Sequence, residues 1–316
     1  IPAHLELFEY QKMRGSLRIS VFPDDSTDAQ SLMQHAEAAL HRAKINPLHE
    51  GVCFYSEDME TNSIARRVHY TQIKQAIVHH RVVTLYQPLV NALTGETIAV
   101  EALMRIADEA GNLISPIEFI TLAEETRLII PLGEQMISQA LAQLKVWQSE
   151  NKRIRLCLNI SPIQFLDPHF VPFLLHTIDQ HGVQPSQIEL EVTESLMLQN
   201  LQQVIRDMTQ LRDIGISISI DDFGTGYSCL SYLKILPVDV LKIDRSFINQ
   251  LTIETPEEPL VQAITQLAKG ASLTSVAEGV ENEFQVHRLQ EFGVSLLQGF
   301  YFSRPVTADK IKTRYF

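Results

Sequence analysis

The segment ISIDDFGTGYS, residues 218–228, has the pattern of a buried strand that ends in a glycine-rich turn. Its isoleucines share one face of the strand and Ser219 and Asp221 share the other, because successive strand side chains point to opposite faces. Asp222 follows at once, in phase with the isoleucines. Two adjacent carboxylates repel each other unless a cation or solvent separates them. If both are to face the same side, the strand must stop or bulge between them, and the two glycines that follow allow such a turn.

Eight short apolar runs, this one included, lie between residues 82 and 302, and helical patterns separate most of them. They are VVTLYQPLV, TIAVEALMR, RLCLNISP, IELEVTES, SISIDDFG, VLKIDRS, LTSVAEGVE and LLQGFYF. The first two are joined by residues 91–97, too few for a helix, which predicts an antiparallel hairpin. The later connections are long enough for crossover helices, which indicates parallel strands. We therefore predict an α/β fold, a (β/α)8 TIM-like barrel with an antiparallel first strand.

The N-terminal part of the chain has a different pattern. SLRISVF and GVCFYS have the composition of short strands, and residues 28–45 between them have helical spacing. We predict a small α/β remnant over residues 1–57, a connecting helix over 58–80 and the barrel over 81–316. The first residues do not resemble a natural start, so we expect a fragment of a longer protein.

Charge and cysteine usage restrict the class of protein. The formal net charge of −12 argues against non-specific binding to nucleic acid or anionic membranes, because both need basic patches. No apolar run approaches the ~18 residues of a membrane helix, and no signal peptide is visible. Cys53, Cys157 and Cys229 are far apart, which is typical of reduced thiols. We expect a cytoplasmic fragment that contacts neither DNA nor a membrane, although its parent protein could carry an anchor elsewhere.

Polar residues recur at the ends of the predicted strands, on the face opposite the aliphatic side chains. Seven strands contribute one each: Glu101, Asn159, Glu191, Asp221, Lys242, Glu278 and Gln298. The carboxyl ends of barrel strands form one mouth, where catalytic groups converge. Carboxylates with an amide and a lysine suit a hard divalent cation such as Mg²⁺ or Mn²⁺, whereas zinc-type Cys or His spacing is absent from the sequence. Such a site supports metal-assisted hydrolysis of a phosphoester.

Each of these residues also has an ordinary structural explanation. Glu101 could be a surface or capping group, and Asn159 could satisfy the backbone of a turn. Lys242 and Asp244 could form a simple buried ion pair. GTGYSC, residues 224–229, lacks the third glycine of a dinucleotide-binding loop, so that function is not indicated. The coincidence of seven polar groups at seven strand ends favours a functional site.

Seven motifs, in this order, resemble those of the EAL domain family. They are EALMR (101–105), LNISPIQF (158–165), ELEVTES (189–195), DDFGTGYSCLSYL (221–233), LKIDRSF (241–247), AEGVEN (277–282) and QGFYFSRP (298–305). The resemblance covers roughly residues 70–312. It implies a barrel with an antiparallel first strand and a cyclic di-GMP phosphodiesterase activity. Such an enzyme hydrolyses one ester bond of the cyclic dinucleotide to give linear pGpG, with Mg²⁺ or Mn²⁺ as cofactor.

The resemblance also implies roles for individual residues. Two metal ions would be bound by Glu101, Asn159, Glu191, Asp221, Asp222 and Glu278. Asp221 would bridge the ions, Lys242 would hold the attacking water, and Glu278 would be the general base, with Glu101 also catalytic. The substrate would be bound by Gln87, Leu103, Arg105 and Gln298. Glu194 and Glu281 would anchor the loop 222–228, which in the family couples substrate binding to dimerisation, so we expect a homodimer formed through the barrel.

Residues 1–57 resemble the C-terminal part of a GGDEF domain. The G-G-[DE]-E-F loop itself is absent from the sequence, so we expect no cyclase activity from this chain. The main alternative function is a non-catalytic cyclic di-GMP receptor. It would bind the nucleotide tightly in EDTA and would not hydrolyse it when metal is added. A third hypothesis is an unrelated barrel enzyme that uses Lys242 as a Schiff-base amine.

Overall fold

The structure is a computed structural model of the chain. It describes residues 17–22, 25–33, 52–54, 57–150, 154–198, 200–225, 233, 235–252 and 259–315. The chain divides into two compact units, Ile1–Thr71 and Gln72–Phe316. The division falls within the predicted connecting helix, which is present as α2 (Glu57–Val78).

In the first unit, both predicted strands are present. β1 (Leu17–Ile19) and β2 (Val52–Phe54) pair in parallel. The predicted helix between them is described only at its start, where residues 29–33 are helical, and its remainder lies outside the described residues. Asp28 caps this start, because its carboxylate accepts a hydrogen bond of 2.8 Å from the backbone N–H of Ser31.

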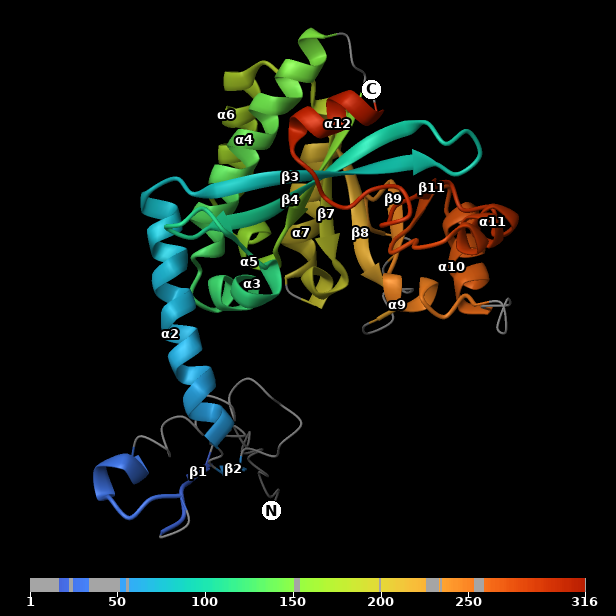
Figure 1. Ribbon diagram of the computed structural model, residues 1–316. Helices are drawn as coiled ribbons and strands as arrows, with labels where there is room; N and C mark the ends of the chain where they lie inside the picture. Colours follow the sequence, from blue (N-terminus) through green and yellow to red (C-terminus); the bar gives the residue numbers. More distant parts are fainter. Residues whose placement is uncertain are drawn as a thin grey trace, which may run out of the picture. The chain divides into compact units, whose positions relative to one another are not determined.

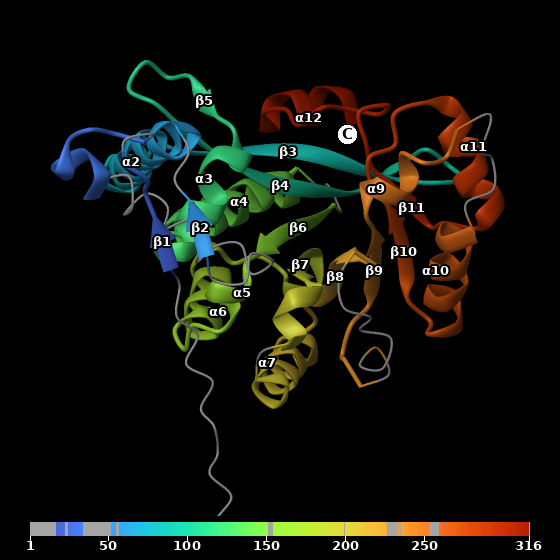
Figure 2. The ribbon, with the colours of Figure 1, turned by 90° about the horizontal axis from the view of Figure 1, so that it is seen from below.

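The second unit is a closed barrel of eight strands (Figures 1 and 2). The strands are β3 (Val82–Asn91), β4 (Thr97–Ala107), β6 (Arg155–Ile160), β7 (Ile188–Thr193), β8 (Ser217–Phe223), β9 (Val240–Ile243), β10 (Thr274–Ala277) and β11 (Leu296–Leu297). They pair in the order β3-β11-β10-β9-β8-β7-β6-β4, and a β3–β4 pairing closes the ring. β3 is antiparallel to both of its neighbours. The predicted barrel with its reversed first strand is therefore confirmed.

Helices follow the strands along the chain and cover the barrel (Figure 1). They are α3 (Pro116–Glu125), α4 (Ile129–Ser149), α5 (Pro162–Phe165), α6 (Phe170–His181), α7 (Leu201–Asp213), α9 (Arg245–Ile248), α10 (Pro259–Gly270), α11 (Glu283–Phe292) and α12 (Ala308–Tyr315). Short 3₁₀ turns occur at η1 (Pro185–Gln187) and η2 (Glu194–Leu198), and the strand β5 (Leu113–Ile114) extends the sheet beside β4. Several ends have ordinary caps, such as the Ser161 and Gln164 capping box of α5 and left-handed Gly182 after α6.

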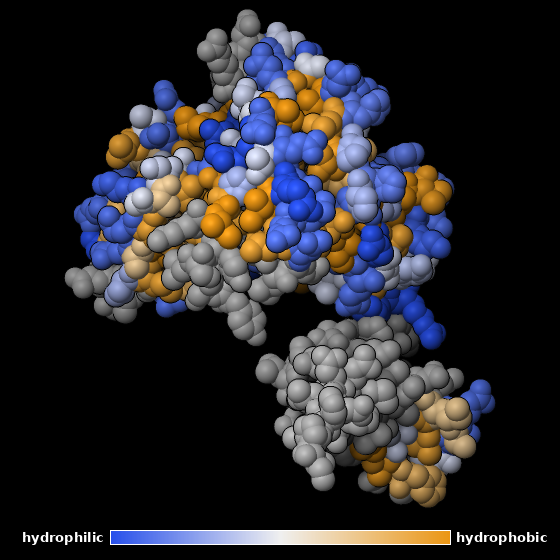
Figure 3. All heavy atoms as spheres, turned by 180° about the vertical axis from the view of Figure 1, so that it is seen from behind, coloured by the Kyte–Doolittle hydropathy of each residue, from blue (hydrophilic) through white to orange (hydrophobic). Residues whose placement is uncertain are grey.

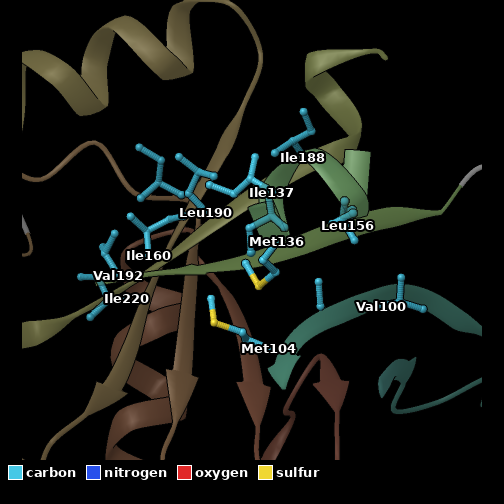
Figure 4. Close-up of a cluster of buried hydrophobic side chains, with 14 of the residues drawn as sticks. Val100, Met104, Met136, Ile137, Leu156, Ile160, Ile188, Leu190, Val192 and Ile220 are labelled. Carbon is cyan, nitrogen blue, oxygen red and sulfur yellow. The ribbon is translucent and has the colours of Figure 1, made fainter. Parts of the chain in front are cut away.

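The alternation along the strands creates two apolar layers. Outward-facing residues such as Ile160, Leu190 and Ile220 pack with Met136 and Ile137 of α4 in the layer between strands and helices (Figure 4). A smaller cluster lies inside the barrel and consists of Leu89, Ala99, Cys157, Val240, Val276 and Leu296. The polar residues of the predicted mouth follow these interior positions along the same strands, so the small cluster is an apolar floor below them.

The surface mixes apolar and polar side chains, as the face in Figure 3 shows. Leu93 and Ile117 are the most exposed large apolar side chains among the described residues, at 83% and 86% of their full surface. None of the helices in the described parts of the chain has the length and apolar character that crossing a membrane requires.

Candidate active site

Lys242 lies at the centre of a group of carboxylates at the mouth of the barrel. Its ammonium group donates to Glu191 at 2.6 Å, and it lies 2.5 Å from a carboxylate oxygen of Glu278 and 3.5 Å from one of Asp221. The Lys242 side chain is 1% exposed, and the Glu191 side chain is fully buried. Four sequence-predicted residues from four strands or strand ends, β7 to β10, therefore meet at one point.

Glu101 on β4 is hydrogen-bonded to the two remaining predicted residues, Asn159 and Gln298. Its two carboxylate oxygens accept hydrogen bonds from the amide of Asn159 on β6 and the amide of Gln298 after β11. The Gln298 amide also donates to Gln87 on β3 at 3.2 Å, and the Gln87 amide donates to the carbonyl of Ser303 at 2.9 Å. All seven residues predicted at strand ends are thus brought to the mouth, and none of the simple capping explanations applies to Glu101. The predicted strand-end position of Glu101 is wrong, however, because β4 stays paired with β3 beyond it and ends only at Ala107.

The strand carrying the two aspartates bulges where they stand. The pairing of β8 with β9 shifts register between Ile220 and Phe223, and Asp222 has a left-handed φ of +55°. The backbone N–H of Asp222 donates to a carboxylate oxygen of Asp221 at 3.0 Å. Asp221 remains half-buried in the barrel, whereas Asp222 is exposed. The bulge predicted from the alternation of the sequence is confirmed.

Burial and mutual repulsion raise the pKa values of the acids. Burial raises the pKa of Glu278 to about 8, against the opposing effect of Lys242. Asp222 is exposed as a residue, but partial burial of its carboxylate, then the charges of Asp221 and Asp244, raise the pKa of that group to about 6. Burial also raises the pKa of Glu191 well above its ordinary range. Burial lowers the pKa of Lys242, but the surrounding carboxylates outweigh it and raise that pKa well above its ordinary value.

The donor set fits a divalent cation. Four acidic side chains, those of Glu101, Glu191, Asp221 and Glu278, act on the one ammonium group of Lys242, so the mouth has more acidic groups than basic ones. Oε1 of Glu191 and Oε1 of Gln298 are buried and have no hydrogen-bond partner among the described residues. Oxygen atoms of this kind are the ligands that Mg²⁺ and Mn²⁺ prefer. The residues present therefore fit the metals that the sequence predicts.

A second acidic group lies deeper in the barrel. Ligand atoms of Cys157, Glu189 and Glu191 lie within 4.8 Å of one another. Glu189 already accepts a hydrogen bond of 2.7 Å from the guanidinium group of Arg155. Burial raises the pKa of the Cys157 thiol well above its ordinary value, so this thiol is protonated at neutral pH. Cys157 is therefore part of the barrel interior and not a reactive thiol.

The remaining predicted residues lie around the mouth at different distances from the cluster. Leu103 and Arg105 follow Glu101 on the same face of β4 and are half-buried. Burial lowers the pKa of Arg105, and the nearby charge of Glu101 opposes that effect. Glu194 is buried at the first residue after β7. Glu281 is exposed, and its role as an anchor of the loop 222–228 stays a prediction, because residues 226–228 lie outside the described residues.

The structure also distinguishes the alternatives for Lys242. Among the described residues, Lys242 pairs with three carboxylates but not with Asp244, whose side chain instead caps α9 by accepting from the N–H of Ser246 at 3.0 Å. A lysine that is kept charged in this way is unsuited to Schiff-base chemistry, which needs the free amine. Asp244 itself was not predicted as a site residue, although it shares a strand face with Lys242 and acts on the pKa of Asp222.

Comparisons with known proteins agree with this geometry. The model of the EAL domain family matches residues 71–305. MucR of Pseudomonas aeruginosa, a bifunctional diguanylate cyclase/cyclic di-GMP phosphodiesterase, is 37% identical over 301 residues, which are 95% of this chain and 44% of MucR. The cyclic di-GMP phosphodiesterase NbdA of the same species is 34% identical over 93% of this chain and 38% of NbdA.

Solved structures give the same result. The structure of the PaMucR phosphodiesterase in complex with c-di-GMP is similar with a TM-score of 0.73 and 39% identity, and the match covers 77% of this chain and 99% of that one. The chain spans less than half of the length of the two curated relatives described above. Because the family model covers most of the barrel unit and the barrel mouth carries the expected residues, this chain belongs to the EAL domain family.

Proposed function

We propose that the chain is a metal-dependent phosphodiesterase that hydrolyses cyclic di-GMP to linear pGpG. The observation that carries the proposal is the buried group of four carboxylates around Lys242 at the barrel mouth. Similar proteins are named cyclic di-GMP phosphodiesterases, and one was solved with c-di-GMP. None of the predicted ligand residues is replaced in this sequence.

Two divalent ions, Mg²⁺ or Mn²⁺, would be held by Glu101, Asn159, Glu191, Asp221, Asp222 and Glu278. When bound, such ions neutralise phosphate charge and make a water molecule a better nucleophile at neutral pH. The four acidic side chains around one lysine, which a bound cation would hold in their ionised form, support this proposal.

The chain's own residues would orient the reactants and move the proton. Glu278 would take the proton of the attacking water, because its carboxylate lies 2.5 Å from the ammonium group of Lys242, the residue proposed to hold that water. Lys242 would hold that water and stabilise the negative charge that develops on the phosphate. The water oxygen would bond to phosphorus and the bond to the O3′ atom would break. The O3′ would leave as a hydroxyl by taking up the proton that Glu278 had received from the water. Arg105 would meet the second phosphate, with Gln87, Leu103 and Gln298 lining the nucleotide pocket.

The test is incubation of the purified chain with cyclic di-GMP and Mg²⁺ or Mn²⁺, with pGpG followed by chromatography. Turnover that depends on metal and is lost in Glu101→Ala is expected. Turnover no higher than that of Glu101→Ala would contradict the proposal. Tight nucleotide binding in EDTA, with no hydrolysis after metal is added, would instead indicate the receptor function.

Three further proposals concern the whole protein. Activity would take place in the cytoplasm. The barrel would form a homodimer, which sedimentation at several concentrations would detect. Residues 1–57 would be the remnant of a GGDEF domain, and the described part of that segment contains the parallel pair of β1 and β2.

A further inference from the structure

Two of the proposed metal ligands stand on separate loops that contact the same short helix. Asp222 lies in the bulge at the end of β8, and two residues later Gly224 has φ +93°. A Cβ atom on Gly224 would lie 3.2 Å from the ring of Phe247 on α9 and 3.5 Å from Ile264 on α10. The backbone that follows Asp222 is therefore packed directly against the ring of Phe247.

The loop that carries Glu278 lies against the same helix. Gly279, with φ +72°, is the residue after Glu278. A Cβ atom there would lie 2.5 Å from the Cβ atom of Arg245 and 3.3 Å from its Cα atom. Only glycine permits this approach, because the nearest atoms belong to the backbone and first side-chain carbon of α9.

Gln285 of α11 joins the helix to the Glu278 loop through one buried amide. Its Nε2 atom donates to the carbonyl of Ile248, the last residue of α9, at 3.0 Å. Its Oε1 atom accepts from the backbone N–H of Glu281 at 2.8 Å. Gln285 is 4% exposed, so both hydrogen bonds are protected from water. Neither α11 nor Gln285 has a role in the proposed chemistry.

We propose that α9 and Gln285 form one support that fixes Glu278 relative to Asp222, with Gln285 as a positioning residue. Asp222 is fixed through Gly224 and Phe247, and Glu278 is fixed through Gly279 and the Gln285 amide. The two carboxylates then move together, although no hydrogen bond joins their loops directly among the described residues. Since a displacement of 1 Å at a catalytic group can slow a reaction about 10²-fold, such a support would act on the rate.

Hydrogen exchange of the metal-free chain tests the coupling without metal or substrate. In Gln285→Leu, we expect amides of residues 278–282 and also of 221–225 to exchange about tenfold faster. Faster exchange at residues 221–225 is the result that shows coupling, because Gln285 does not contact these residues in the described structure. Phe247→Leu should in turn accelerate exchange at 278–282. The matched control is Gln187→Leu, which removes an amide hydrogen bond of 2.9 Å to the Ile154 carbonyl at the opposite end of the barrel and should change neither segment.

Exchange that accelerates in only the segment next to each substitution would overturn the proposal. If Gln285→Leu fails to fold, Gln285→Glu keeps the acceptor for Glu281 and removes the donor to Ile248, and the same comparison applies. The catalytic consequence rests on the proposed function: Gln285→Leu should lower kcat about 10- to 100-fold with little change in KM. If the wild-type protein is inactive but the substitutions still accelerate exchange in both segments, the proposed phosphodiesterase function is refuted, whereas the proposed support by α9 and Gln285 stands.

Discussion

Replacement of Lys242 by methionine should destabilise the metal-free protein in a pH-dependent way. Methionine fills a similar volume but removes the ammonium group that pairs with Glu191 and Glu278. Breaking a buried ion pair by removing one partner costs roughly 3–5 kcal/mol. We expect about 3 kcal/mol, the lower end, because Glu278 keeps 20% and Asp221 keeps 14% of its side chain exposed. That corresponds to a fall in Tm of roughly 6–12 °C for a domain of this size.

The direction of the pH dependence follows from the raised pKa values of the acids. The pKa of Glu278 is about 8 in the folded protein, above its ordinary value, and the pKa of Glu191 is also raised. A group with a raised folded-state pKa favours folding below its unfolded pKa, and that contribution is lost as the pH rises through the folded value. Without Lys242 both pKa values rise further. The variant should therefore be close to wild type in stability near pH 5 and clearly less stable near pH 8.5.

Urea unfolding of the metal-free proteins at both pH values measures this effect. Lys310→Met, at an exposed lysine of α12, is the control and should change stability little at either pH. Addition of Mg²⁺ or Mn²⁺ should restore part of the loss in Lys242→Met, because a cation that binds only the folded state stabilises it. Activity should stay absent. Equal destabilisation at pH 5 and pH 8.5 would refute the electrostatic reasoning and indicate a loss of packing.

Four other changes have distinct expected outcomes. Glu101→Gln should lower the rate of pGpG formation by about 10²-fold or more, because it removes a charge from the proposed metal site. Metal binding at pH 7 should release at least one proton, and the apparent affinity for the metal should rise between pH 6 and 8. The reason is that the pKa of Glu278 is raised to about 8, that of Asp222 to about 6 and that of Glu191 well above its ordinary range. Calorimetry in two buffers that gives no proton release would contradict this. Gly299→Ala places a Cβ atom 2.0 Å from the Val280 carbonyl oxygen and should lower the free energy of unfolding by about 2 kcal/mol or more in urea titrations. In the control Gly270→Ala, the added Cβ atom has no neighbour within 4 Å, so the free energy of unfolding should change by less than about 0.5 kcal/mol. Asp222→Gly should raise stability by about 1 kcal/mol, because glycine accepts a φ of +55°, and should reduce activity; a loss of stability in thermal melting would contradict this.

Much of the barrel could be predicted because its signals are local. Alternation along each strand identified the inner and outer faces, and the length of each connection separated the one hairpin from the parallel crossovers. The end of β11 could not be predicted in the same way. The run from residue 296 to 302 has a strand pattern, yet only Leu296–Leu297 pairs as a strand. The following residues leave the sheet, and the carbonyl of Ser303 accepts a hydrogen bond from Gln87, which is distant in sequence.

The same limit applies to the site. Local pattern places Glu101, Asn159 and Gln298 at strand ends, but it does not show that both amides donate to the one carboxylate. That arrangement exists only once the barrel has closed and brought β4, β6 and β11 to one mouth. Gln285 gives no signal in the sequence for the same reason, since its two hydrogen-bond partners belong to α9 and to a loop before its own helix.

The doubled aspartate illustrates how the fold separates two like charges without moving either away from the site. Asp221 keeps its place in the strand, and the left-handed backbone of Asp222 turns the second carboxylate into the loop. A non-glycine residue in this conformation costs about 1–2 kcal/mol, and burial with the charge of Asp221 raises the pKa of Asp222 to about 6. Both costs persist in the folded protein, although the backbone N–H and the hydroxyl of Thr225 donate to the Asp222 carbonyl oxygen at 3.2 and 2.8 Å. Strain of this kind is found where function requires it. A divalent cation held by both aspartates would relieve the repulsion, so under the proposed function the position of Asp222 would link binding of a second ion to the conformation of the segment that follows it.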